Sequence, residues 1–150
     1  MSMDAKEEFR QLVDSTARGK ESHYYYSAGI PADVISADPA TRSIVVRVTA
    51  TENEISCSGS LDEGVVSTIA DYWTSTLITA VNGGKSAVTT SLGVQALKRI
   101  EPGTVLHIKC QATDAALAMP HATATFASAE NEGDVYALAT HTKYFKPLKK

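Results

Sequence analysis

Residues 62–81 read DEGVVSTIADYWTSTLITAV, and this stretch decides the fold that the sequence predicts. Apolar side chains recur in it three or four positions apart, at Val66, Ile69, Ala70, Trp73, Leu77 and Val81. This spacing places them on one face of an α-helix. Ser60 and Glu63 have the spacing of a capping box at the start, and Asn82-Gly83-Gly84 is a typical helix stop. The sequence therefore predicts a long helix whose apolar face is covered by another layer of structure.

The segments on either side of this helix predict one further helix and a set of strands. Residues 4–18 place Phe9, Leu12 and Val13 at helical spacing among charged residues, with an end near Gly19. A hairpin is expected where residues 34–36 and 43–48 flank the turn sequence Asp38-Pro39-Ala40-Thr41. Four strand-like segments follow the long helix, at 86–97, 104–113, 122–129 and 135–145. This order indicates an α+β fold in which an antiparallel sheet wraps a long helix.

Length, charge and cysteine content narrow the class of protein. The chain has 150 residues and a net charge of −3, from 14 Lys and Arg against 17 Asp and Glu. A dedicated nucleic-acid-binding domain is not expected, because it would need a basic face. Cys57 and Cys110 form no disulfide framework or metal-ligand pattern with the histidines, so we expect buried apolar thiols and no metal. The acidic first 18 residues do not resemble a targeting signal, and no segment is apolar enough to span a membrane, so we expect a soluble cytoplasmic protein.

A single carboxylate interrupts the long predicted helix. Asp71 is the only formally charged residue from Gly64 to Gly84, and Ser67, Thr74 and Ser75 lie three or four positions from it. An unpaired carboxylate is costly to bury. Two interpretations remain open: Asp71 faces solvent or a neighbouring hydrogen-bond donor, or it is a general base or nucleophile in a largely dry pocket.

The start of the same helix, Leu61-Asp62-Glu63-Gly64, is a second candidate site. Backbone N–H groups and the helix dipole at such a position can polarise a carbonyl oxygen, and Gly64 allows a substrate to approach the backbone. Asp62 and Glu63 are also the residues that an ordinary first helical turn prefers. Capping and carbonyl binding are therefore alternatives here.

Several short motifs together resemble the hotdog-fold acyl-CoA thioesterases, in the branch of the phenylacetate-pathway and small eukaryotic enzymes. They are 59–64 (GSLDEG), Asp71, 87–90 (AVTT) and 141–144 (HTKY). The resemblance covers residues 30–146 and implies a hotdog fold, an antiparallel sheet wrapped around a long central helix. We expect residues 1–29 to form an N-terminal helix and connector, and residues 30–150 to form the hotdog domain.

The resemblance implies roles for individual residues. The helix carboxylate that activates water or attacks the thioester in the family corresponds to Asp71, and a water-orienting Ser on the next strand corresponds to Thr89. Ser56 replaces a loop Asn. The loop that reads Leu-His-Gly-Gly in the family has Leu61, Asp62, Glu63 and Gly64 here, so the His and one Gly that help to bind the thioester carbonyl are missing. The helix acid is kept, and the carbonyl-polarising motif is rewritten with two acids.

Partners and further contacts also follow from the resemblance. Lys85, Lys98 and Arg99 are candidate contacts for nucleotide phosphates. For His141 and Lys143 in the last strand, a solvated strand face is the preferred interpretation. No separate cofactor is expected, because coenzyme A or a carrier phosphopantetheine is part of the substrate. Active sites in the family form between subunits, which implies a homodimer, with a homotetramer as the alternative.

The resulting prediction is an acyl-thioester hydrolase acting on an acyl-CoA or a carrier-bound acyl chain. In it, Asp71 activates water and the helix N-terminus near Gly64 holds the carbonyl. One alternative is release or cyclisation of a polyketide-like chain, in which Asp62, Glu63 or Asp71 deprotonates the substrate. The other is a non-catalytic acyl-binding partner that retains only the fold.

Overall fold

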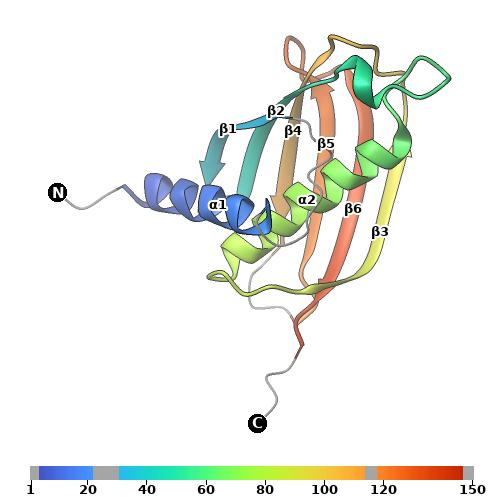
Figure 1. Cartoon of the computed structure of the whole chain (residues 1–150). Helices are drawn as coiled ribbons and strands as arrows, with labels where there is room; N and C mark the ends of the chain where they lie inside the picture. The colour runs from blue at the N-terminus through green and yellow to red at the C-terminus, as the bar shows by residue number, and fades with distance from the viewer. Residues whose placement is uncertain (1–3, 22–30, 114–117, 147–150) are drawn as a thin grey trace.

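A computed structural model describes residues 4–21, 31–113 and 118–146 of the chain (Figure 1). Two helices and six strands carry the fold. In chain order they are α1 (Ala5–Glu21), β1 (Ala32–Asp38), β2 (Ser43–Thr49), a single 3₁₀ turn (Glu52–Glu54), α2 (Glu63–Val81), β3 (Val88–Ala96), β4 (Val105–Ala112), β5 (His121–Ser128) and β6 (Val135–Tyr144). The predicted helices, hairpin and four later strands are confirmed.

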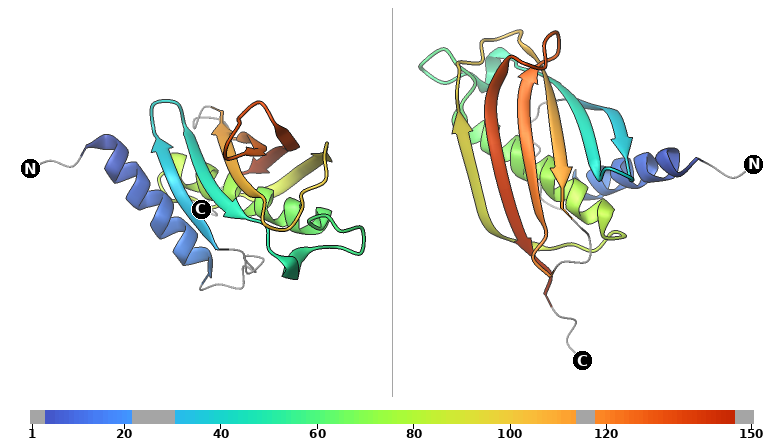
Figure 2. Two further views of the ribbon diagram at one scale, coloured as in Figure 1. Left: turned by 90° about the horizontal axis from the view of Figure 1, so that it is seen from above. Right: turned by 180° about the vertical axis from the view of Figure 1, so that it is seen from behind.

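The strands form one antiparallel sheet in the order β1-β2-β4-β5-β6-β3. β3 is the first strand after α2 and lies at the edge of the sheet, beside the last strand, β6. α2 runs diagonally across one face of the curved sheet, and α1 lies at the β1 end of the same face (Figures 1 and 2). This is the α+β arrangement of a sheet around a long helix that the sequence predicts.

The core lies between the sheet and α2. On β2 and β4, alternate residues point to the helix and are fully buried, among them Ile44, Val46, Leu106 and Ile108. This alternation is what a strand with one covered face requires. In α2, every residue from Tyr72 to Ala80 is buried, so the second half of the helix is enclosed on all sides rather than along one stripe.

The N-terminal helix shares this core. Phe9 and Val13 are buried and Leu12 is half-buried, as their helical spacing predicts. The Tyr72 hydroxyl on α2 donates to the Ala17 carbonyl at 2.8 Å, and the Arg10 guanidinium donates to the Val34 carbonyl at 2.9 Å. These contacts tie α1 to α2 and β1. The division at residues 29 and 30 stays a prediction, because residues 22–30 lie outside the described part.

The ends of α2 differ in one respect from the prediction. The predicted capping box of Ser60 and Glu63 is wrong: the N-cap residue is Asp62, whose carboxylate accepts a hydrogen bond from the Gly64 N–H at 2.8 Å. A carboxylate directly before the first turn satisfies an orphan N–H and leaves no place for Ser60 in that role. The predicted stop is confirmed, since Gly83 and Gly84 have φ of +65° and +89°, where a side chain would be strained.

Candidate active site

Asp71 lies near the middle of α2, and its side chain is 37 % exposed. Ser75, one helical turn further on, donates its hydroxyl to Asp71 Oδ1 at 3.1 Å. The i, i+4 spacing seen in the sequence therefore forms a real contact. The carboxylate is thus both held by the helix and reachable from outside the core.

A fully buried histidine stands behind this carboxylate. His141 on β6 has 0 % exposure, and its Nε2 atom lies 3.7 Å from Asp71 Oδ1. The same nitrogen is 2.8 Å from the Thr89 hydroxyl on β3, and Nδ1 is 2.6 Å from the Thr74 hydroxyl on α2. One imidazole therefore connects the helix to the edge strand.

A buried lysine completes the cluster. Lys143 is 4 % exposed, and its ammonium donates to the Ser75 hydroxyl at 2.9 Å and, at 3.5 Å, to the Thr89 hydroxyl. Burial lowers the pKa of Lys143 from its ordinary value of 10.5, and the charge of Asp71 acts in the opposite direction. The six residues Asp71, Thr74, Ser75, Thr89, His141 and Lys143 are called the polar cluster below.

Strand register explains why these side chains meet. Residues 137, 139, 141 and 143 of β6 alternate toward α2 and are all buried. Between Thr89 and Ser91 the pairing of β3 with β6 is irregular, so that Thr89 lies opposite Lys143 while Ser91 lies opposite Thr142. This bulge turns the Thr89 hydroxyl toward the helix side. The interpretation of His141 and Lys143 as a solvated strand face is therefore wrong, because both lie on the face of β6 that packs against α2.

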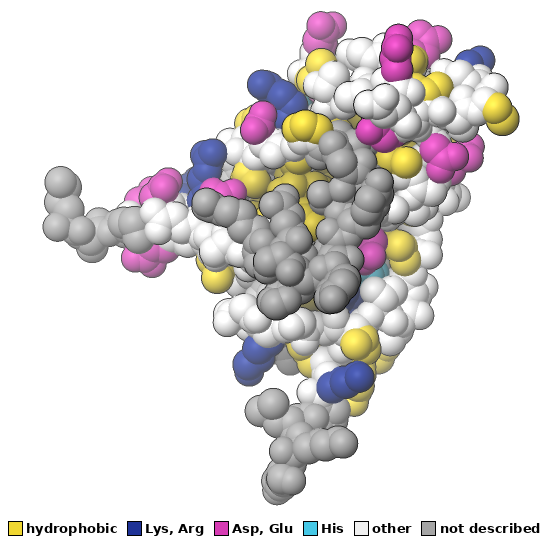
Figure 3. All heavy atoms as spheres, in the orientation of Figure 1, with side chains coloured by type: hydrophobic (Ala, Val, Ile, Leu, Met, Phe, Trp, Pro, Cys, Tyr) yellow, Lys and Arg dark blue, Asp and Glu magenta, His cyan; other side chains and the backbone are white. Residues whose placement is uncertain are grey.

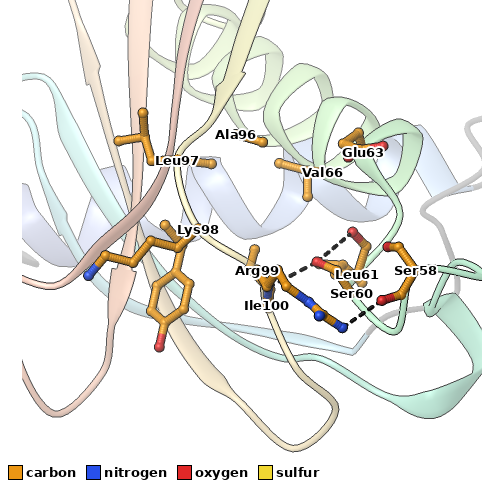
Figure 4. Close-up of a pocket in the computed structure, with 12 residues that line it drawn as sticks. Ser58, Ser60, Leu61, Glu63, Val66, Ala96, Leu97, Lys98, Arg99 and Ile100 are labelled. Carbon is orange, nitrogen blue, oxygen red and sulfur yellow. Dashed lines mark hydrogen bonds between the residues drawn. The ribbon is translucent and has the colours of Figure 1, made fainter.

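A cavity of about 320 Å³, separate from the polar cluster, opens beside the start of α2 (Figure 4). Its walls come from the loop before α2, the first turn of α2, the β3–β4 connection and β6. The lining residues are Ser58, Ser60, Leu61, Glu63, Val66, Ala96, Leu97, Lys98, Arg99, Ile100, Tyr136 and Ala137. Four of the residues predicted to act in catalysis or binding, Leu61, Glu63, Lys98 and Arg99, thus come together here.

The basic residues at this cavity already have partners. Lys98 pairs with Asp134, and this hydrogen bond raises the pKa of the Lys98 ammonium above its ordinary value. The Lys98 ammonium also lies 5.9 Å from the centre of the Tyr136 ring. Arg99 donates to the Ser58 carbonyl at 2.5 Å and so crosses the mouth of the loop before α2. A phosphate at this cavity would compete with those contacts.

The remaining predicted site residues lie around the loop before α2 and at the far end of the helix. Leu61 is buried and its N–H donates to the Ile100 carbonyl, which fixes the loop against the β3–β4 connection. The Ser56 N–H donates to the Ser60 carbonyl and so closes the loop. Gly64 is exposed, and its N–H donates to the Asp62 carboxylate. Lys85 is exposed in the turn after α2, away from the cavity.

Apart from Lys85, the predicted site residues therefore form two groups. Asp71 and Thr89 join the polar cluster, whereas the helix-start residues line or border the cavity. Asp62 and Asp71 are nine positions apart, about 13 Å along a helix, so within one chain the two groups do not contact the same atom. Sequence reasoning missed His141 and Lys143 as members of the site. The signal was the pattern His-x-Lys at alternate positions of a strand, which puts both on one face.

Three further observations concern surface charge, metal ligands and membrane-spanning helices. On the face drawn in Figure 3, acidic and basic side chains are scattered rather than gathered into one field of a single sign. Within residues 4–21, 31–113 and 118–146, no group of three or more His, Cys, Asp or Glu side chains is arranged to hold a metal ion. Neither described helix is long and apolar enough to cross a membrane.

Solved structures with the same architecture are known. The Escherichia coli PaaI protein from the phenylacetic acid degradation operon superposes with a TM-score of 0.75 at 15 % identity, over 91 % of this chain and 95 % of that one. Zebrafish thioesterase superfamily member 2 gives a TM-score of 0.74 at 21 % identity, over 94 % and 95 %. The chain has the hotdog fold.

A third hotdog structure shows a ligand. It is a hypothetical thioesterase from Streptococcus pneumoniae with coenzyme A, and it matches with a TM-score of 0.73 at 16 % identity, over 87 % of this chain and 98 % of that one. No protein-family model and no curated protein matches the sequence. At these identities the comparisons establish the fold, and the chemistry has to be argued from the residues of this chain.

Proposed function

We propose that this protein is an acyl-thioester hydrolase acting on an acyl-CoA or a carrier-bound acyl chain, with Asp71 as the base that activates water. The observation that carries the proposal is the layered polar cluster. Asp71 and Thr89 are accessible from outside, whereas His141 and Lys143 lie buried behind them. A charged and hydrogen-bonded cluster inside a core is costly for stability alone, so its placement at an accessible carboxylate favours a chemical role.

The hotdog neighbours support the substrate class. Two of them are named as thioesterases, and the Streptococcus pneumoniae protein was solved with coenzyme A. An acyl thioester has an electrophilic carbonyl carbon and a thiolate leaving group, so one positioned base and one ordered water are enough for hydrolysis. Asp71 would take a proton from that water while the water oxygen attacks the carbonyl carbon. The carbon–sulfur bond then breaks, and the thiol leaves with a proton.

Carbonyl polarisation near Gly64 is the second part of the proposal, and it requires that the Gly64 N–H be released from its present hydrogen bond. The Gly64 N–H donates to Asp62, so a thioester oxygen can take that N–H only when the Asp62 side chain turns away. Gly64 lies seven residues before Asp71, about 10 Å along the helix. A water at Asp71 and a carbonyl at Gly64 of the same chain are therefore too far apart to react.

We propose that a homodimer solves this distance problem, with Asp71 of one chain facing the helix start of the other. The edge strand β3 supports this arrangement. It is nine residues long, carries no charge, and is mostly exposed at the edge of the sheet. Such an edge is open to pairing with another strand. Sedimentation velocity tests the proposal, because a particle of one 16.0 kDa chain would contradict it.

A thioester panel tests the catalytic proposal. Wild type, Asp71→Asn and Asp33→Asn are incubated with acyl-CoAs of different chain length and with an acyl carrier protein, and free thiol is followed by chromatography. Asp33 is an exposed carboxylate on β1 and serves as the matched control. We expect thiol release by wild type and Asp33→Asn, and a loss of about 100-fold or more in Asp71→Asn.

Product mass distinguishes hydrolysis from the other functions. Hydrolysis adds one water to the released acyl group, whereas a cyclised product lacks that water. Thiol release without added water would instead indicate that the protein releases or cyclises a polyketide-like acyl group. Wild type that consumes no thioester, but is stabilised by one against heat, would be an acyl-binding protein.

A further inference from the structure

The hydrogen-bond directions inside the polar cluster can be worked out from the number of protons that each group carries. The Thr74 hydroxyl has one proton, and it donates that proton to the Ala70 carbonyl at 2.6 Å. In the 2.6 Å contact between Thr74 Oγ1 and His141 Nδ1, the imidazole must therefore be the donor. The proton of a neutral His141 is thus on Nδ1.

The second ring nitrogen then acts as an acceptor. With the proton on Nδ1, Nε2 has a lone pair, and the Thr89 hydroxyl lies 2.8 Å from it. Thr89 therefore donates its single proton to His141.

Lys143 reinforces the same directions. An ammonium can only donate, so Ser75 and Thr89 both accept from Lys143. Ser75 is then free to give its own proton to Asp71 Oδ1 at 3.1 Å. Each hydroxyl of the cluster therefore donates its proton in one direction only, and the buried group that it contacts determines that direction.

From these directions we infer that His141 is a positioning residue that makes the Thr89 hydroxyl an acceptor for the water activated by Asp71. The inference rests on the proposed hydrolase function. A water between Thr89 and Asp71 meets two acceptors, so it donates one proton to each. Its lone pairs then point away from both residues, toward a bound carbonyl carbon. Both acceptor oxygens lie close to one atom, His141 Nε2, at 2.8 Å and 3.7 Å, as a bridging water requires.

Two substitutions at position 141 separate the contacts of the ring. In His141→Asn, the shorter amide can reach Thr74 as Nδ1 does, but it leaves Thr89 without its acceptor. In His141→Gln, the longer amide places an oxygen where Nε2 was, and Thr89 keeps its acceptor. We expect kcat to fall about 100-fold in His141→Asn with little change in KM, and most of kcat to return in His141→Gln. A purely structural role would make kcat follow thermal stability in both variants.

Substitutions of Thr89 on β3, the strand paired with β6, test the same inference without changing His141, in case the variants at position 141 misfold. Thr89→Val keeps the branched shape and removes the hydroxyl, and Thr89→Ser keeps the hydroxyl. Thr123→Val on β5 is the control at an exposed threonine. We expect a large loss of kcat only in Thr89→Val. Equal activity of Thr89→Val and Thr123→Val would overturn the inference.

Long-range ¹H–¹⁵N spectra of the wild-type protein read the tautomer directly, with the His141 signals identified by their loss in His141→Asn. We expect a neutral ring protonated at Nδ1. A ring protonated at Nε2, or an imidazolium at the pH of the assay, would falsify the hydrogen-bond directions. The thiol-release assay keeps the two proposals apart. If Asp71→Asn is inactive and His141→Asn retains full kcat, only the positioning role fails. If wild type itself releases no thiol, the hydrolase function fails and the positioning role with it.

Discussion

Replacing Lys143 by Met removes the buried ammonium of the polar cluster while keeping a side chain of similar length. Lys143 is 4 % exposed, and its polar partners on the described elements are Ser75 and Thr89, with Asp71 acting through its charge. The change therefore tests what this charge contributes to stability.

The expected change in the free energy of unfolding is small, because two larger effects oppose each other. Loss of the charged hydrogen bond to Ser75 costs about 1.5–3 kcal/mol. Relief from keeping an ammonium out of water offsets this by several kcal/mol. Asp71 is 37 % exposed, so the substitution does not strand a buried carboxylate, and the larger loss typical of a broken buried ion pair does not apply. We expect Lys143→Met to lie within about 2 kcal/mol of wild type at neutral pH.

The pH dependence of this difference has a definite sign. Burial lowers the pKa of Lys143 in the folded protein, whereas the unfolded chain keeps a value near 10.5. Between these two pKa values the unfolded state binds more protons, so wild-type stability rises with pH in that window. Lys143→Met lacks this contribution. The stability of wild type relative to the variant should therefore increase as the pH rises from the folded pKa of Lys143 toward 10.5, by about 1.4 kcal/mol for each unit of lowering.

Urea unfolding at several pH values between 7 and 10.5 measures this difference. Lys109→Met on β4 is the matched control, because Lys109 is exposed. The control should differ from wild type by a constant amount across the range. A difference between wild type and Lys143→Met that stays constant or falls with rising pH would refute the reasoning, since the ammonium would then not be destabilised by burial.

Three further predictions follow from the described contacts. Asp62→Ala should cost about 1 kcal/mol through loss of the N-cap, measured by urea unfolding, and Asp62→Asn should restore it, because Asn caps equally well. The expectation of two buried thiols is confirmed for Cys110 and wrong for Cys57, which is exposed. Because burial raises the pKa of Cys110 to about 12, a thiol reagent at pH 8 should modify Cys57 alone in the folded protein and both thiols in urea. Two fast-reacting thiols before unfolding would contradict this. Phe126→Ala should destabilise by about 3–5 kcal/mol, since the ring is completely buried, whereas Thr125→Ala beside it should change stability by less than about 1 kcal/mol.

The helices and strands were predictable because their signals are local. The three- and four-residue spacing of apolar residues in α2 and the turn residues between strands depend only on neighbours in the chain. The cap of α2 was less predictable, since Ser60 and Asp62 are both good capping residues. Ser60 instead accepts a hydrogen bond from the Ile100 N–H, a contact 40 residues away that no local pattern contains.

The buried face of β6 was the main error, and its cause is physical. Alternation shows which residues share a face, but the side chains on the two faces decide which one looks apolar. On β6 the face that contacts α2 contains Ala137, Ala139, His141 and Lys143, whereas the opposite face contains Leu138, which is 39 % exposed. Judged by hydrophobicity alone, the exposed face of β6 is therefore predicted to be the buried one.

By itself, the sequence determined the order of elements, the long uncharged helix and the single carboxylate within it, since each depends on residues close together in the chain. Only the tertiary structure decided what surrounds that carboxylate. The pairing of β3 with β6 and the bulge between Thr89 and Ser91 bring Thr89, His141 and Lys143 against α2. Those contacts span 50 or more residues, and they form because burying the apolar faces of the sheet and helix fixes where every polar side chain on those faces must lie.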